Sequence, residues 1–176
     1  MALPTQGAMS RPPDELSPER AEALAIDLYE QPGHLIRRAQ QIAVSMFFDA
    51  LGRDVTPVQY AILRMLQERP GIDQVTLAQE VALDTSTTAE IAARLEAKGW
   101  IVRELLPRRQ RRLVLTADGE AVLGRLVPGL SAMNQQMLAR LDEGERHEFM
   151  RLLRKFVQLN NDQSRAPLRR GVAESG

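Results

Sequence analysis

Four consecutive hydroxyl side chains occupy residues 85–88, directly after Asp84. Serine and threonine are poor helix formers, so four of them in one predicted helical turn need a reason. At the start of a helix, their hydroxyl groups and the free backbone N–H groups can contact the phosphates and base edges of a nucleic acid. The alternative is a serine- and threonine-rich capping turn with a structural role alone. We interpret Thr85, Ser86 and Thr87 as candidate DNA contacts.

Arginines cluster in residues 103–112, which contain five of them and one acid, Glu104, for a local charge of +4. The whole chain carries 23 basic and 23 acidic residues, which excludes a uniformly basic nucleic-acid binder but allows a local basic patch. Arginine at the tip of a hairpin can enter a narrow minor groove, where the negative potential is enhanced. A solvated charged turn is the alternative. We interpret Arg108, Arg109 and Arg111 as candidate DNA contacts.

Other kinds of site chemistry lack their usual residues. The chain has no cysteine, and its two histidines, His34 and His147, are far apart in the sequence. We find no glycine-rich phosphate loop, no nucleophile elbow and no cluster at metal-ligand spacing. The sequence therefore predicts no catalytic residues, no cofactor and no metal, and a protein that is not an enzyme. No apolar run approaches the length of a membrane span and the N-terminus lacks an apolar signal region, so we expect a cytoplasmic protein.

The elements around the two clusters form a helix-turn-helix followed by a hairpin. A helix about 10–12 Å across fits the major groove of DNA, and a hairpin beside it can contact the adjacent backbone or minor groove. Asp84 is the predicted N-cap of the second helix, and Gly99 is the predicted residue just past its end. The predicted elements are, in order, a short helix at 74–82, a helix at 85–98, and strands at 100–106 and 112–116.

Further helices are predicted on both sides of this unit. Pro32-Gly33 should break a short first helix, and capping boxes at Thr56 and Asp142 open two others. Thr116 caps a long helix to about 140 that contains Pro128, where a kink is expected. Apolar stripes on helices 34–51, 120–141 and 143–160 are too extensive for the core of one small domain. Two copies could bury them together, which predicts a homodimer; a monomer whose extra helices fold back on it is the alternative.

The predicted fold is mainly α with a small β-hairpin wing: a winged helix-turn-helix domain with N- and C-terminal dimerisation helices. The predicted segments are a disordered arm at 1–16, dimerisation helices at 17–54, a DNA-binding lobe at 55–116, dimerisation helices at 117–161 and a disordered tail at 162–176.

Over about residues 34–160 the chain resembles the MarR family of winged-helix regulators. The segments that carry the resemblance are TPVQYAILRML, TLAQEVALDTSTTAEIAARLEAKGWIVRE and PRRQRRLVLTADGEAVL. The resemblance implies a dimer, a palindromic double-stranded operator and, often, a small phenolic or aromatic acid as inducer.

The resemblance also suggests roles for individual residues. Arg109 matches the arginine at the wing tip that enters the minor groove. Two positions earlier the family usually has an aspartate, whereas this chain has Pro107, so the usual bracing of the wing is lost. Glu90 either accepts from a cytosine amino group or braces Arg94 one turn later, and we favour bracing. The residues placed on the DNA-facing side of the recognition helix are Thr85, Ser86, Thr87, Glu90 and Arg94.

A ligand site is predicted in the crevice between the dimer helices and the DNA-binding lobe. His34, Arg37 and Arg38 lie early in the first long helix beside its apolar stripe, where a cation would suit an aromatic carboxylate. Alternatively, the arginines are solvated and the histidine is a polar first-turn residue. We predict a sequence-specific transcriptional regulator, a repressor released by a small aromatic acid or its thioester. A non-specific architectural DNA binder, or a protein-interaction module, is the alternative function.

Overall fold

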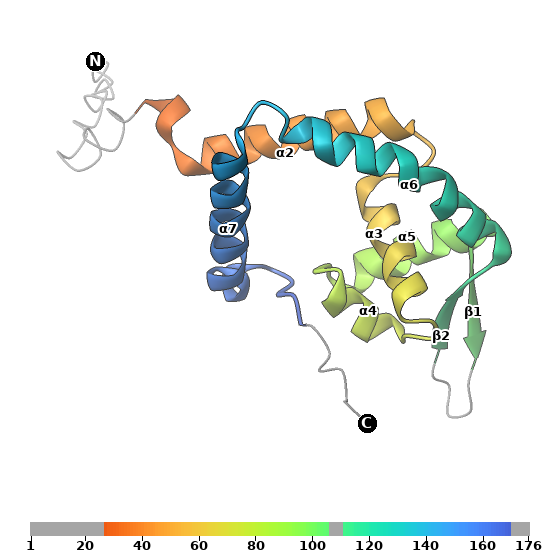
Figure 1. The fold of residues 1–176 in the computed structure, drawn as a ribbon. Coiled ribbons are helices and arrows are strands. Elements are labelled where there is room, and N and C mark those ends of the chain that lie inside the picture. The colour runs from red at the N-terminus through yellow and green to blue at the C-terminus, as the bar shows by residue number, and fades with distance from the viewer. Residues whose placement is uncertain (1–26, 106–110, 170–176) are drawn as a thin grey trace, which may run out of the picture. The chain divides into compact units, whose positions relative to one another are not determined.

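The structure is a computed structural model that describes residues 27–105 and 111–169. It contains two compact units, residues 1–42 and 43–176, whose boundary falls inside helix α2 (Figure 1). The predicted disordered arm at 1–16 lies outside the described residues. The elements are η1 (Leu28–Glu30), α2 (Pro32–Leu51), α3 (Pro57–Glu68), α4 (Gln74–Glu80), α5 (Thr85–Ala97), β1 (Ile101–Leu105), β2 (Arg111–Leu115), α6 (Ala117–Met137), α7 (Glu143–Leu159) and η3 (Asn161–Gln163).

Helices α3, α4 and α5 and the β1–β2 hairpin form the lobe predicted as a winged helix-turn-helix. Helix α3 contacts α4, α6 and β2, while α5 contacts α4 and β1. In Figure 1 the hairpin extends away from the helices as an arm that continues from the end of α5. The predicted fold class, mainly α with a hairpin wing, is therefore confirmed.

The predicted caps begin the helices where expected. Thr56 Oγ1 accepts a hydrogen bond from Gln59 N at 3.2 Å, and Gln59 Oε1 accepts one from Thr56 N at the same distance. Asp142 and Glu145 form the same reciprocal box at the start of α7. These local bonds satisfy backbone N–H groups that have no partner inside the helix, which is why sequence alone could locate them.

The base of the hairpin is fastened to the helices on two sides. The strands pair antiparallel, with Ile101 opposite Leu115. On one side, Leu113 N donates to Ile72 O at 3.0 Å, which joins β2 to the turn between α3 and α4. On the other, Thr116 Oγ1 donates to the Gly99 carbonyl at 2.6 Å. The wing therefore emerges from a rigid base.

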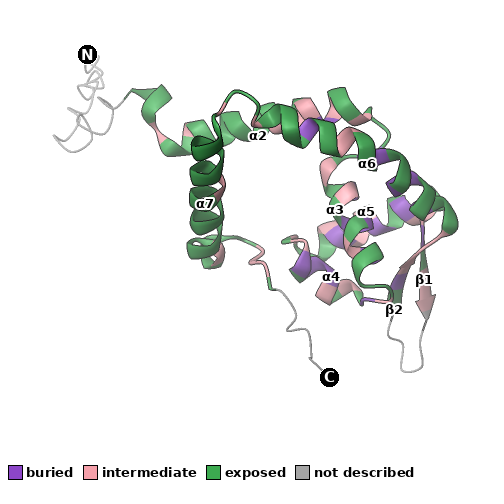
Figure 2. Cartoon of the chain, in the orientation of Figure 1, coloured by how far each residue is buried: buried purple, intermediate pink, exposed green. Residues whose placement is uncertain are grey.

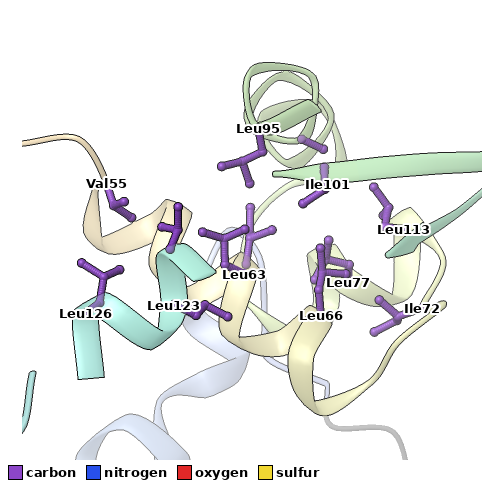
Figure 3. Packing of buried hydrophobic residues seen from close by; sticks show 13 residues of the cluster. Val55, Leu63, Leu66, Ile72, Leu77, Leu95, Ile101, Leu113, Leu123 and Leu126 are labelled. Atoms are coloured by element: carbon purple, nitrogen blue, oxygen red, sulfur yellow. The ribbon is translucent and has the colours of Figure 1, made fainter. Parts of the chain in front are cut away.

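The core of the lobe is aliphatic. Thirteen buried apolar residues from α3, α4, α5, α6, both strands and the loops between them form one cluster (Figure 3). Among the described residues, the largest fully buried side chains include Leu63, Leu77, Leu95 and Leu113. Because every element of the lobe contributes to this core, the core holds α5, the predicted recognition helix, and the β1–β2 wing in a fixed relative position.

The last long helix is very different. None of the described residues of α7 is buried, and Figure 2 shows its ribbon almost entirely in the colour of exposed residues. Its large apolar residues recur at helical spacing and remain exposed in the single chain: Phe149, Leu152, Leu153, Phe156 and Val157. Within the described residues, no helix combines the length and apolar character that crossing a bilayer requires.

The chain is interrupted next to the break predicted at Pro32-Gly33: Gln31 is extended and α2 begins at Pro32, since the first turn needs no N–H from that residue. Most of the short helix predicted before this break lies outside the described residues. The prediction for the C-terminal tail needs correction. The tail expected to be disordered from 162 is folded at its start: Leu168 N donates to Asn161 Oδ1 at 2.8 Å, and Arg169 N to the Gln79 carbonyl at 3.1 Å. The spacing of apolar residues could not predict this folded segment, because individual polar hydrogen bonds hold it in place.

Candidate nucleic-acid interface

The first turn of α5 is organised around the carboxylate of Asp84. Its Oδ1 accepts from Ser86 Oγ at 2.6 Å and from Thr87 N at 2.8 Å, and its Oδ2 accepts from Thr87 Oγ1 at 2.7 Å. The Ser86 hydroxyl bond, followed by the two from Thr87, holds the pKa of Asp84 well below its usual range. The carboxylate therefore stays ionised and keeps both side chains in fixed orientations.

The four hydroxyl residues divide between two roles. Thr85 and Ser86 are exposed and Thr87 is half-buried, so these three predicted contacts lie on the accessible side of the first turn. Thr88 is fully buried, and its hydroxyl donates to the Asp84 carbonyl at 2.9 Å. The fourth hydroxyl thus belongs to the core, while the first three are the ones that a nucleic acid could reach.

Further along α5, Glu90 and Arg94 lie on the same exposed face. Their closest charged atoms, Glu90 Oε2 and Arg94 Nη2, are 3.9 Å apart, and both side chains are about 70% exposed. This geometry agrees with the favoured interpretation, in which Glu90 braces Arg94. An exposed pair of this kind contributes little to stability, so both groups can rearrange around a ligand.

A tight turn joins α4 to the recognition helix. Ala82 adopts a φ of 54°, in the left-handed region that usually requires glycine or asparagine. Leu83 N then donates to the Ala78 carbonyl at 2.9 Å, which closes the end of α4. The sequence had no signal for this conformation, because alanine occupies the position where glycine is usual.

The wing carries less free charge at its base than the arginine count suggested. Arg103 Nη2 lies 2.7 Å from Glu96 Oε2 on α5, and Arg112 pairs with Glu104 across the hairpin. The predicted local charge of +4 omitted Glu96, which lies outside the hairpin segment but is adjacent to it in space. Two of the five arginines counted in the segment, Arg103 and Arg112, therefore have an acidic partner in the structure.

The tip residues were the strongest sequence signal for DNA binding. Arg108, Arg109 and Pro107 lie outside the described residues, and Arg111 is described only as the first residue of β2. Their predicted contact with DNA, and the effect of the proline on the wing, therefore stay predictions.

The predicted ligand residues lie at the start of α2, in the unit formed by residues 1–42. The His34 ring packs edge-on against Tyr29, with centroids 5.5 Å apart. Arg38 Nη1 donates to Gln41 Oε1 at 3.2 Å, and Arg37 is exposed. Both arginines remain accessible, and their role as ligand contacts stays a prediction. Among the described residues, no group of histidines and carboxylates could hold a metal ion.

A helix-turn-helix whose second helix presents an accessible polar first turn, followed by a basic hairpin, defines a winged-helix DNA-binding protein. The model of the MarR family matches residues 55–112, from the loop before α3 into β2. The transcriptional regulator HosA of Escherichia coli is 38% identical over 106 residues, which cover 59% of this chain and 78% of HosA.

Solved structures give the same result. The PcaV transcriptional regulator of Streptomyces coelicolor matches with a TM-score of 0.72 at 38% identity, covering 76% of this chain and 96% of PcaV. BpsR of Bordetella bronchiseptica matches with a TM-score of 0.70 at 29% identity, covering 75% of this chain and 97% of BpsR. The chain belongs to the MarR family, and it is a transcriptional regulator.

Proposed function

We propose that this regulator is a homodimeric repressor that binds a palindromic operator and releases it when a small aromatic acid, or its thioester, binds. The observation that carries the DNA-binding part is the accessible first turn of α5, with Thr85 and Ser86 exposed, followed by a wing whose sequence includes Arg108, Arg109 and Arg111. Helix α5 suits the major groove and the wing tip suits the adjacent minor groove.

The apolar stripe of α7 supports the dimer. A row of five large apolar residues left half-exposed on one helix face is unfavourable in water, and a second copy would cover it. A symmetric pair of lobes would then present two recognition helices to a palindrome, whose half-sites are about 34 Å apart.

The effector class rests on the relatives and on local residues. PcaV is described in complex with its natural ligand, and the DNA binding of BpsR is regulated by 6-hydroxynicotinic acid. In this chain, Arg37 and Arg38 are exposed cations beside the apolar residues of α2, with His34 one turn away. A carboxylate on an aromatic ring suits a guanidinium next to apolar surface.

Release would follow from a shift in the spacing of the two recognition helices. A ligand that prefers a spacing other than the one the operator requires weakens DNA binding by its difference in affinity for the two arrangements. A hundredfold weaker operator complex needs a coupling of about 2.7 kcal/mol, and by linkage the operator must weaken ligand binding equally.

Selection of bound sequences from a random DNA pool tests the DNA-binding part. One enriched palindrome is expected, and Arg109→Ala should weaken binding to it by about 1–3 kcal/mol per half-site with a shallower salt dependence. Enrichment of no sequence would instead indicate an architectural binder. Calorimetric titration with hydroxybenzoates, cinnamates and their thioesters, with and without operator, tests release. Equal affinity for free and DNA-bound protein would contradict the release mechanism.

A further inference from the structure

The chain after α7 is closed into a loop by the side chain of Asn161. Asn161 Oδ1 accepts a hydrogen bond from Leu168 N at 2.8 Å, and Asn161 Nδ2 donates one to the Leu168 carbonyl at 3.1 Å. The amide therefore bonds both polar backbone groups of Leu168, since it carries a donor and an acceptor. The Leu168 side chain is half-buried and lines one hollow with Leu153 and Val157 of α7. We call residues 161–168 the clasp.

The clasp is followed directly by Arg169, which is bonded to the helix-turn-helix. Arg169 N donates to the Gln79 carbonyl at 3.1 Å. Gln79 lies in the last turn of α4, where carbonyl groups lack the usual donor further along the helix, so an external N–H group finds an acceptor there. The end of the described chain is therefore fixed just before the turn that leads into α5.

Arg169 brings an unpaired positive charge to this position. Residues 163–169 contain two arginines and no acid. Arg169 is exposed, and its guanidinium makes no ion pair with another residue that the structure describes. The acids nearest to Gln79 in the following sequence are already engaged: Glu80 is buried in an ion pair with Arg69, and the Asp84 carboxylate accepts hydrogen bonds from the first turn of α5. The guanidinium is thus available to an external anion.

We propose that Arg169 binds a phosphate of the DNA backbone beside the bases that α5 contacts. This proposal rests on the proposed DNA-binding function and adds a third contact element to the recognition helix and the wing. In a helix-turn-helix, the first helix crosses the DNA backbone, while the start of the second helix reaches the bases. A guanidinium held at the end of the first helix, α4, is therefore placed for a phosphate. Its forked N–H groups suit the oxygens of a phosphodiester.

Binding of the full chain to two duplexes tests the proposal: the palindrome enriched from the random pool, and a scrambled duplex of the same composition. Arg169→Gln removes the charge but keeps a polar side chain, and should weaken binding by about fivefold per bound subunit at about 0.15 M salt. The slope of log affinity against log salt concentration should become shallower by about 0.9 per subunit. Both duplexes should lose the same factor, because phosphates carry no sequence information.

Arg140→Gln is the matched control for the loss of charge. Arg140 is exposed and precedes α7, a helix about 25 Å long, whereas Arg169 follows it. This variant should bind both duplexes like wild type.

The outcomes separate this proposal from the proposed function. If Arg169→Gln binds both duplexes like wild type, Arg169 is not a contact, while specific operator binding stands. A loss confined to the palindrome would indicate a structural effect on α5 and would overturn the phosphate contact. If wild type binds both duplexes equally, specific recognition fails, and an equal loss on both in Arg169→Gln still supports the contact. A wild-type chain that binds neither duplex would overturn both proposals.

The clasp has a test of its own. Asn161→Ala removes both hydrogen bonds that close it and should weaken DNA binding by no more than Arg169→Gln does, because Arg169 is displaced but still present. A double variant with both substitutions should bind no more weakly than Arg169→Gln alone. Circular dichroism checks that each variant is folded. Additive losses in the double variant would show that the clasp does not position Arg169.

Discussion

The DNA-binding lobe and helix α7 contain similar apolar residues but differ in how far these residues are buried. In the lobe, leucines such as Leu63 and Leu95 have 0% of their surface exposed, because helices and strands surround them on all sides. In α7, five apolar residues follow the spacing of one helix face, from Phe149 to Val157, yet each keeps between 42% and 55% of its surface exposed. The lobe completes its core within one chain, whereas the apolar face of α7 stays uncovered in the single chain.

Because of this difference, substitutions in the two regions should change different properties: the stability of the fold in the lobe, and the association of subunits in α7. Substitutions in the lobe core should lower the free energy of unfolding whatever the association state, because the core side chains pack against residues of the same chain. Substitutions on the apolar face of α7 should shift the equilibrium between subunits, because that face would pack against the second copy that we propose. Variants of the two regions can test this division.

The largest effect is expected in the lobe core. Leu63→Ala should lower the free energy of unfolding by about 2–5 kcal/mol, because it leaves a cavity among residues that cannot collapse into it. Leu159→Ala, at a site that is 72% exposed, is the matched control and should change the stability little. Denaturant titration of both variants at one protein concentration measures the difference. Equal destabilisation by the two variants would contradict the division between the two regions.

The next effect concerns association. Phe156→Ala should raise the dissociation constant of the dimer by about 30-fold or more, which corresponds to about 2 kcal/mol for a buried aromatic contact. Arg151→Ala on the same helix, where the arginine pairs with Glu148 at the surface, should leave it nearly unchanged. Sedimentation over a concentration series measures both. A wild-type chain that sediments as a 19.7 kDa monomer would show that α7 is not an interface.

A smaller effect sharpens the description of the lobe. A Cβ at Gly119 would lie 2.0 Å from the Trp100 carbonyl oxygen, so Gly119→Ala must push α6 away from the start of β1. We expect the free energy of unfolding to fall by about 1–3 kcal/mol. Gly124→Ala, in the same helix with open space around it, should be neutral or gain up to about 1 kcal/mol. Thermal unfolding of the pair checks this, and a stable Gly119→Ala would mean that α6 is not held so close.

The smallest effect depends on pH. Because the folded-state pKa of Asp84 lies below its unfolded value, its ionised form stabilises the fold at neutral pH. That contribution is full above about pH 4 and is lost as pH falls further toward the folded-state pKa. Asp84→Ala should therefore melt below wild type at pH 7, and the gap should narrow progressively below pH 4. A gap that is constant with pH would indicate that the carboxylate charge plays no part.

Sequence reasoning succeeded where the determinants are local. The caps at Thr56, Asp84 and Asp142 each depend on residues within three positions, and Gly99 adopts the positive φ expected of it. It failed where partners come from elsewhere in the fold: nothing in the wing sequence indicates Glu96. The burial of Thr88 could have been predicted, since it precedes the buried Ala92 by four positions and thus shares its helix face.

The Asp84 network sets what the recognition helix can offer to a base pair. The hydroxyl protons of Ser86 and Thr87 both point at this carboxylate, so the surface they turn outward consists of oxygen lone pairs. In the major groove, lone pairs find hydrogen-bonding partners on the amino groups of adenine and cytosine, whereas guanine and thymine present oxygens that repel them. In the operator complex that we propose, the first turn of α5 would therefore favour adenine and cytosine as long as the network persists.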